Sequence, residues 1–188
     1  NVLADFNPVV PKNFKDADVL MLGNLHPGTQ LSVINQMEER PKLIILDTMN
    51  FWMDNALEEL KEVIKHIDVI TINDEEARQL TSEHSLIKKG EHGALLFHKA
   101  KVFFAPALPL EEVFDPTGAG DTFAGGFAGY LAESENISFN NLKSAVIHGS
   151  NLASFCVERF GIERMQSLEK KETNNRLLQF KELTQFDI

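Results

Sequence analysis

Short apolar runs alternate along the chain with longer stretches in which apolar residues recur every three or four positions. The short runs at residues 19–22, 43–46 and 68–72 predict buried strands. The longer stretches at 30–39 and 54–66 predict amphipathic helices that bury one face. Because strands and helices alternate in this order, this part of the chain indicates an α/β layer with a mainly parallel sheet.

The pattern changes in the second half of the chain. Residues 94–98 and 101–105 predict two antiparallel strands. Residues 134–141 predict a loop, 142–160 a helix with an apolar face, and 165–188 a terminal helix. The predicted fold is therefore α/β with three layers and one antiparallel excursion.

The stretch at residues 114–132, FDPTGAGDTFAGGFAGYLA, joins a turn, a glycine-rich loop and the start of a helix. Pro116 fixes its own φ and biases the preceding residue away from helix, so no helix begins before it. Gly118, Ala119 and Gly120 then offer backbone N–H groups where a helix leaves its first donors unpaired. This arrangement predicts a site for an anion such as a phosphate.

The helix that follows has one apolar face, because Phe123, Phe127 and Leu131 recur every four residues. Its glycines each cost about 1 kcal/mol relative to alanine, which would be tolerated if another backbone packs close. These glycines are Gly125, Gly126 and Gly129.

Asp121 directly follows the glycine loop, in the first turn of the helix. The helix dipole favours a carboxylate there. If the loop holds the γ-phosphate of ATP, Asp121 is placed to accept the proton of an attacking hydroxyl group. Taken alone, the segment is equally consistent with an aspartate that only caps a helix.

The longer string DPTGAGDTFAGGFA resembles the C-terminal signature of the ribokinase/PfkB family of carbohydrate and nucleoside kinases. The resemblance implies a ribokinase-like three-layer αβα sandwich. It also implies an ATP-dependent kinase that transfers the γ-phosphate to a hydroxyl of a small sugar. In that reading Gly118, Ala119 and Gly120 form the anion hole and Asp121 is the catalytic base.

A second motif lies in TINDEEARQL, where Asn73 and Glu76 match the Asn-x-x-Glu element of ribokinase-like enzymes. The resemblance implies that both residues organise Mg²⁺, usually through water. One carboxylate beside an amide suits Mg²⁺, which retains much of its water shell. The alternative is a helix N-cap followed by first-turn glutamates.

Candidate nucleotide contacts come from the same resemblance. The segment IKKGEHG resembles the strand and turn beside the nucleotide phosphates, with Lys88 in place of a hydroxyl residue and with Gly90 and Gly93 as its glycines. A hairpin turn with solvated lysines is the alternative. The adenine pocket is expected near Ser150 and Asn151, in the middle of a helix.

The resemblance covers roughly the C-terminal two thirds of such a kinase. We therefore expect a single domain, residues 1–188, that lacks the N-terminal part and the lid. Only residues 82–85 separate the Asn-x-x-Glu segment from the next strand, although a crossover needs about a dozen residues. We expect a gap in the sequence near 85–86.

Composition narrows the partners. The chain has 188 residues and a net charge of 18 − 28 = −10, without a basic patch, which argues against nucleic acid and anionic membranes. The one cysteine, Cys156, excludes a disulfide within the chain and favours a cytoplasmic location. The expected ligands are ATP, Mg²⁺ and a small sugar or nucleoside. A homodimer is a further expectation from the family, and potassium is a candidate activator without a clear site.

Two other functions remain open. A nucleoside or vitamin-precursor kinase of the same superfamily differs in acceptor-binding residues that this chain does not contain. A non-catalytic regulatory protein that binds nucleotide would not need the carboxylate of Asp121, so its presence favours an enzyme.

Overall fold

The computed structural model describes residues 6–73, 76, 80, 85–88, 92–98 and 101–185, and for 85–88 it describes only the backbone. The chain forms two compact units, residues 1–87 and 88–188. Each unit is described by itself below. The organisation as a single domain and the gap near 85–86 stay predictions.

Unit 1 contains a parallel sheet of three strands, β1 (Val19–Leu22), β2 (Leu43–Asp47) and β3 (Val69–Asn73). In the register of this sheet, Val19 lies opposite Leu43 and Ile45 opposite Val69. The three predicted strands are thus confirmed. Since the strands are parallel, their carboxyl ends lie at the same edge of the sheet.

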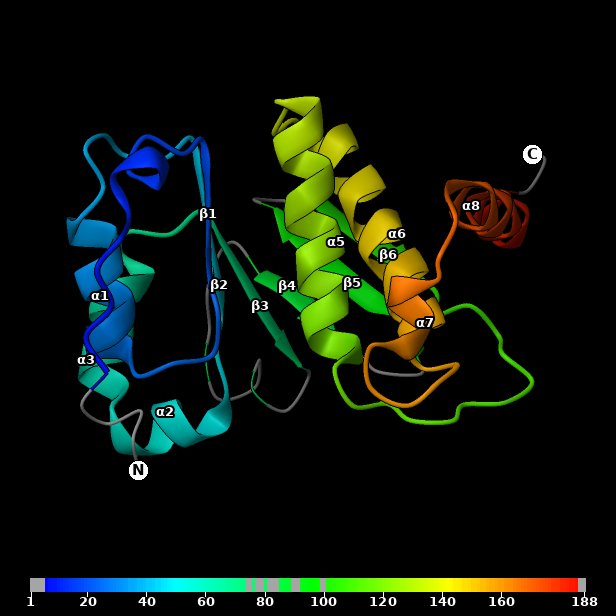
Figure 1. Ribbon diagram of the computed structural model, residues 1–188, viewed down its shortest axis with the longest axis horizontal. Helices are drawn as coiled ribbons and strands as arrows, with labels where there is room; N and C mark the ends of the chain where they lie inside the picture. Colours follow the sequence, from blue (N-terminus) through cyan, green and yellow to red (C-terminus); the bar gives the residue numbers. More distant parts are fainter. Residues whose placement is uncertain are drawn as a thin grey trace. The chain divides into compact units, whose positions relative to one another are not determined.

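Helices cover one face of this sheet (Figure 1). A 3-10 helix, Lys12–Phe14, precedes β1, and α1 (Pro27–Asn35), α2 (Asn50–Asn55) and α3 (Leu57–Ile64) follow the strands. The helix predicted at 30–39 begins earlier, because His26 acts as its N-cap and accepts a hydrogen bond from the Gly28 amide at 3.0 Å.

The helix predicted at 54–66 is two helices. Ala56, between α2 and α3, has φ −146° and ψ 38°, which interrupts the helical backbone. The core of unit 1 forms between α3 and the sheet: Leu60 and Val63 of α3 pack with Ile44, Leu46 and other strand residues, and all four are fully buried. This packing fixes the strands whose ends carry the polar residues discussed below.

Strand β4 (Ser85–Lys88) spans the boundary between the units. Unit 2 contains β5 (Ala94–His98) and β6 (Lys101–Ala105), which are antiparallel with Leu96 opposite Phe103. Both strands match their predicted bounds.

Four helices follow in unit 2: α5 (Ala119–Ser134), α6 (Phe139–Cys156), α7 (Glu163–Gln166) and α8 (Lys170–Thr184). The sequence pattern missed α7, which is a single turn. Helix α6 begins three residues before the predicted start, where the Ser138 hydroxyl accepts a hydrogen bond from the Asn141 amide.

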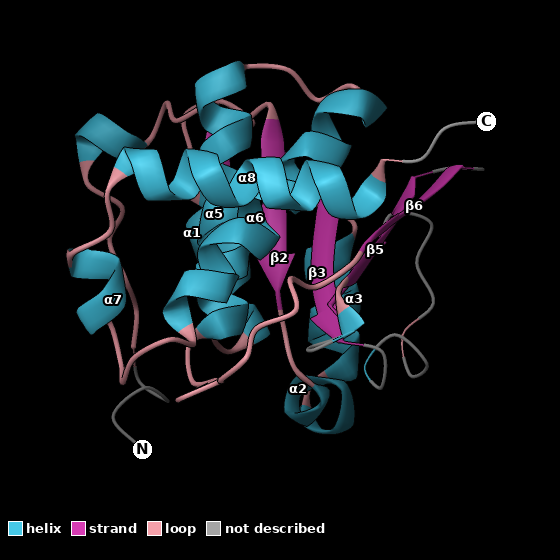
Figure 2. Ribbon diagram, turned by 90° about the vertical axis from the view of Figure 1, so that its right-hand side faces the viewer, coloured by secondary structure: helices cyan, strands magenta, loops and turns pink. Residues whose placement is uncertain are grey.

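Helices α5 and α6 lie side by side and run in opposite directions (Figure 1). Phe127 and Leu131 of α5 are buried, as are Val146 and Phe155 of α6. The beginning of α5 therefore lies beside the end of α6. Helix α8 crosses α6 (Figure 2).

A membrane span can be sought among the helices that the structure describes. None of them combines the length and the apolar composition that crossing a bilayer requires.

Candidate active site

The glycine-rich loop forms a tight turn at the start of α5. Gly118 is the N-cap and has φ 81° and ψ −2°, in the left-handed region that disfavours residues with a Cβ. The Ala119 amide donates to the Pro116 carbonyl at 3.2 Å, and the Thr122 amide donates to the Gly118 carbonyl at 2.8 Å. The turn is thus closed by its own backbone before the helix begins.

Three amides of this turn remain available as donors. The amides of Gly118, Gly120 and Asp121 have no backbone acceptor among the described residues. The Ala119 amide, predicted as part of the anion hole, is engaged with Pro116 in this structure. Sequence reasoning did not include the Asp121 amide, because which donors are free depends on the left-handed conformation of Gly118.

Asp121 lies in the first turn of α5 and is exposed to solvent. Its carboxylate stands at the positive end of the helix dipole, beside the free amides. A negatively charged group at this turn would therefore meet backbone donors with a carboxylate next to them. This combination suits proton acceptance next to a bound phosphate.

The turn is braced by Asp115. Its carboxylate accepts a hydrogen bond from the Thr117 amide at 3.0 Å. The Thr117 amide and hydroxyl, together with the Gly161 amide, hold the pKa of Asp115 below its usual value. Asp115 is therefore ionised at neutral pH. Its hydrogen bond with the Thr117 amide fixes the residues that precede the free amides.

The end of α6 supports the same turn from behind. The carbonyl of Val157, the residue after α6, accepts hydrogen bonds from the Phe114 amide at 2.8 Å and the Asp115 amide at 3.3 Å. The Cys156 thiol lies 3.8 Å from the Thr117 carbonyl and donates to it. Cys156 itself is buried.

In unit 1, Asn73 and Glu76 hold each other at the carboxyl end of β3. The Glu76 carboxylate accepts from the Asn73 amide at 2.8 Å, and the Asn73 side-chain carbonyl accepts from the Glu76 amide at 2.8 Å. Glu76 is buried. This reciprocal pair is the helix-cap geometry that the sequence offered as an alternative, and it also fixes two oxygen atoms at the edge of the sheet.

Further polar residues gather at the same edge. The buried Asp47 accepts a hydrogen bond from the Thr71 hydroxyl at 2.6 Å. Gln30 donates to the Gly23 carbonyl at 2.7 Å and so links α1 to the loop after β1. The side-chain carbonyl of Gln30 and the hydroxyl of Thr48 are buried without a hydrogen-bond partner.

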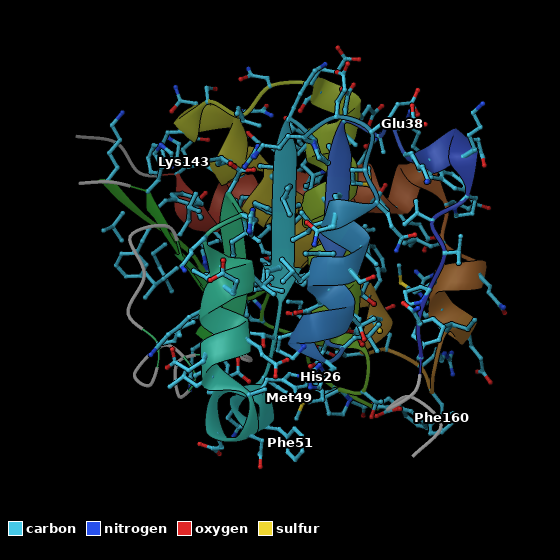
Figure 3. All side chains as sticks on the ribbon, turned by 90° about the vertical axis from the view of Figure 1, so that its left-hand side faces the viewer. His26, Glu38, Met49, Phe51, Lys143 and Phe160 are labelled. Carbon is cyan, nitrogen blue, oxygen red and sulfur yellow. The ribbon has the colours of Figure 1, made fainter. Side chains whose placement is uncertain are left out.

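Aromatic side chains lie beyond these strand ends, at the N-cap of α1 and within α2. His26, Met49 and Phe51 lie at one end of unit 1, whereas Glu38 lies at the other (Figure 3). Trp52 packs edge to face against His26, and its indole N–H donates to Asn24 at 2.8 Å. Sequence reasoning did not single out these residues, because no local spacing shows that the loops after β1 and β2 meet.

The predicted nucleotide contacts around β4 and β5 lie partly outside the described residues. Gly90 and the side chain of Lys88 lie outside the described residues. Gly93 has φ 97°, and a Cβ there would lie 2.1 Å from the Ala105 carbonyl, so this position requires glycine for backbone packing. Its contact with nucleotide stays a prediction.

The two residues predicted near adenine have different environments. Ser150 is half-buried on α6. Asn151 is buried, donates to the Thr173 carbonyl of α8 at 3.0 Å, and has an unpartnered side-chain carbonyl. They precede Cys156 by five or six residues, so they lie about 8 Å along α6 from the support of the turn.

Two hollows in the described part of the protein are lined by residues other than those of the anion-binding turn. One, of about 480 Å³, is lined by Glu158, Arg159, Glu163, Arg164 and Ser167. The other, of about 290 Å³, lies beside Arg40 and His66 in unit 1. The candidate site is therefore assigned to the turn at Asp121, which has three free amides and an exposed carboxylate.

The chain is similar in sequence to known carbohydrate and nucleoside kinases. The sequence model described as pfkB family carbohydrate kinase matches residues 9–168. A cytidine kinase of Thermococcus kodakarensis is 29% identical over 143 residues, 64% of this chain and 50% of that enzyme. A ribokinase of Bacillus subtilis is 33% identical over 115 residues, 55% of this chain and 37% of that enzyme. The chain spans half or less of the length of these relatives.

Among solved structures, the nucleoside kinase of Methanocaldococcus jannaschii, a member of the ribokinase family, matches with a TM-score of 0.73 at 22% identity. The match covers 94% of this chain and 60% of that one. This likeness confirms the predicted α/β, ribokinase-like fold.

Proposed function

Because the chain belongs to the pfkB family of carbohydrate kinases, we propose that it transfers the γ-phosphate of ATP to a hydroxyl group of a small sugar. The observation that carries the proposal is the turn at the start of α5, with free amides and the carboxylate of Asp121 beside them. The chain spans only part of the length of its relatives. The identity of the acceptor is therefore part of the proposal.

Each part of the turn has one role in the proposed reaction. Asp121 accepts the proton of the acceptor hydroxyl as its oxygen attacks the γ-phosphorus, and ADP leaves with the electrons of the broken P–O bond. The amides of Gly118, Gly120 and Asp121 donate to the phosphoryl oxygens, on which negative charge gathers. Donors fixed before the reaction are each worth on the order of 10²–10³ in kcat at such sites.

Mg²⁺ is the second ligand we propose, with Asn73 and Glu76 as its organisers. Their oxygen atoms are of the type that Mg²⁺ prefers, and their mutual hydrogen bonds hold them rigidly. Among the described residues, no three acidic, histidine or cysteine side chains gather into a metal site. Contact through water fits these two oxygen donors, because Mg²⁺ retains much of its water shell. When bound, Mg²⁺ would neutralise charge on the phosphates.

Nucleotide contacts from Lys88, Gly90, Gly93, Ser150 and Asn151 complete the proposal. The unpartnered side-chain carbonyl of Asn151 would accept a hydrogen bond from an amino group. We also propose a cytoplasmic protein without nucleic-acid partners, in keeping with a net charge of −10.

A nucleoside is the second candidate acceptor. The cytidine kinase and the nucleoside kinase among the similar proteins support it. A panel of pentoses, hexoses, sugar phosphates and nucleosides, assayed for ADP release with ATP and Mg²⁺, separates the two candidates. ATP binding without turnover on any acceptor would instead support a regulatory protein that binds nucleotide.

Replacing Asp121 by asparagine tests the assigned base. We expect Asp121→Asn to lower kcat by on the order of a hundredfold or more, because general bases contribute about 10²–10⁴. ATP affinity should stay nearly unchanged, since the backbone donors remain. Steady-state kinetics and calorimetric ATP titration measure the two quantities.

The matched control is Glu133→Gln, which removes an exposed carboxylate from the last turns of the same helix. We expect this variant to keep full turnover. If Asp121→Asn lost ATP affinity and turnover equally, Asp121 would be a structural residue and not the base.

A further inference from the structure

Glu158 lies at the centre of a network of charged side chains next to the end of α6. Its carboxylate accepts a hydrogen bond from Nε of Arg164 at 2.8 Å and another from Arg176 of α8. Arg164 also donates to Glu172 at 2.6 Å. The side chains of both arginines are 16% exposed and that of Glu158 is 26% exposed, so water screens these pairs only partly.

The two arginines also pack on the aromatic ring of Phe155, which is buried in α6. The guanidinium carbon of Arg176 lies 3.5 Å from the ring centroid, and that of Arg164 lies 4.9 Å from it. Planar guanidinium groups favour such ring contacts. The last turn of α6 is therefore held to α7 and α8 through both Phe155 and Glu158.

This end of α6 is the part of unit 2 that supports the anion-binding turn. Val157, directly before Glu158 in the chain, accepts the amides of Phe114 and Asp115. Cys156, one residue earlier, donates to the Thr117 carbonyl. At most one residue thus separates Glu158 from the residues whose atoms touch the turn.

Burial raises the pKa of Glu158, but the hydrogen bonds and charges of Arg164 and Arg176 outweigh it and leave the pKa below its usual value. The carboxylate is ionised in the neutral range and both arginines stay bound to it. The network is therefore a permanent part of the fold at neutral pH.

We propose that Glu158 is a positioning residue for the anion hole, and that α8 fixes the hole through Arg176, Glu158 and the Cys156–Val157 backbone. The catalytic part of this inference rests on the proposed function. The network holds the amides of Gly118, Gly120 and Asp121 in one orientation without touching a substrate.

Amide hydrogen exchange of the full chain tests the proposal without any need for turnover. In Glu158→Gln, which places an amide donor where a carboxylate accepted from two arginines, exchange at residues 114–121 should quicken by about tenfold for the amides that are hydrogen-bonded there, those of Phe114, Asp115, Thr117 and Ala119. The matched control is Glu172→Gln, which removes the other carboxylate bound to Arg164 but does not adjoin the turn. In this control variant, the exchange rates at 114–121 should equal those of the unchanged protein.

Kinetics supply a second readout. In Glu158→Gln, kcat should fall by about tenfold while KM for ATP changes less, because the donors act most strongly on the charge of the transition state. Unchanged exchange at 114–121 in a folded Glu158→Gln protein would overturn the proposal, and so would equal acceleration in Glu172→Gln. An exchange difference without turnover on any acceptor would refute the proposed function and leave the structural role of Glu158 standing.

If Glu158→Gln does not fold, two variants of Cys156 test whether the end of α6 supports the turn. Cys156→Ser keeps a donor for the Thr117 carbonyl, whereas Cys156→Ala removes it. We expect faster exchange at 114–121 in the alanine variant and recovery in the serine variant. Equal exchange in both would contradict support of the turn from α6.

Discussion

At the scale of single residues, the glycines of α5 serve different purposes on neighbouring turns. A Cβ on Gly126 would lie 2.9 Å from the Leu152 side chain and 3.1 Å from Gly149 of α6, so the two helices meet there. Gly125 and Gly129 have open space where a Cβ would stand. The close backbone approach that the sequence suggested thus applies to Gly126 and not to the other two.

Alanine substitutions should separate these roles. A Cβ on Gly149 would lie 2.7 Å from the Phe123 carbonyl, so Gly149→Ala must push the helices apart. We expect it to lower the free energy of unfolding by about 1–3 kcal/mol, as overpacking does. Gly129→Ala should raise it by about 0.5–1 kcal/mol through helix propensity.

Denaturant unfolding of both variants checks this prediction. If Gly149→Ala were as stable as the unchanged protein, α5 and α6 could move apart without a loss in the free energy of unfolding. Destabilisation by Gly129→Ala would show that its open face is needed for something other than helix stability.

The anion-binding turn was predictable at this scale because its signals are local. Asp115, Pro116 and the following glycines determine a turn from their own backbone preferences. The support from Cys156 and Val157 was not predictable, because these residues are about forty positions away in sequence and carry no turn or ligand signal.

At the scale of elements, strands were predicted more accurately than helices. Strands β2 and β3 are mainly apolar runs that are buried along almost their whole length, as burial on both faces of a sheet demands. Helix ends depend on caps, and the cap of α1 is a histidine, which is not among the usual N-cap residues. The fixation of α8 to α6 depends on arginines that sequence spacing alone does not pair with Glu158.

Acid should loosen this fixation of α8. The folded pKa of Glu158 is below its ordinary value of 4.5, and that of Glu172 is lowered in the same way by its hydrogen bond with Arg164. Their contribution to stability is therefore complete above about pH 4.5 and is lost as pH falls through the folded pKa. Thermal unfolding followed from neutral pH to pH 3 should show a steeper loss in the unchanged protein than in Glu158→Gln. Parallel curves would show that Glu158 does not contribute through its charge.

At the scale of the whole molecule, the excess of acidic residues opposes an anionic ligand. A net charge of −10 repels the phosphates of ATP unless helix ends and a cation offset it. The family was predictable because its signature is one continuous string. The acceptor was not, because the chain spans half or less of the similar cytidine kinase and ribokinase.

Removal of Mg²⁺ should therefore do more than stop turnover. We expect chelation by EDTA to weaken ATP binding by about tenfold or more at low salt, since unscreened phosphate charges then face an acidic protein. Calorimetric titration with and without Mg²⁺ measures this change. Equal affinities would show that the cation serves the reaction alone.

The antiparallel pairing of α5 and α6 has an electrostatic consequence for the turn. It places the negative end of one helix dipole, about half an elementary charge, beside the positive end of the other, and the two fields would cancel. Here the Val157 carbonyl at the end of α6 is occupied by the amides of Phe114 and Asp115. The loop that leads into α5 thus neutralises the carbonyl end of its neighbour, and the start of α5 keeps its positive potential for an incoming phosphate.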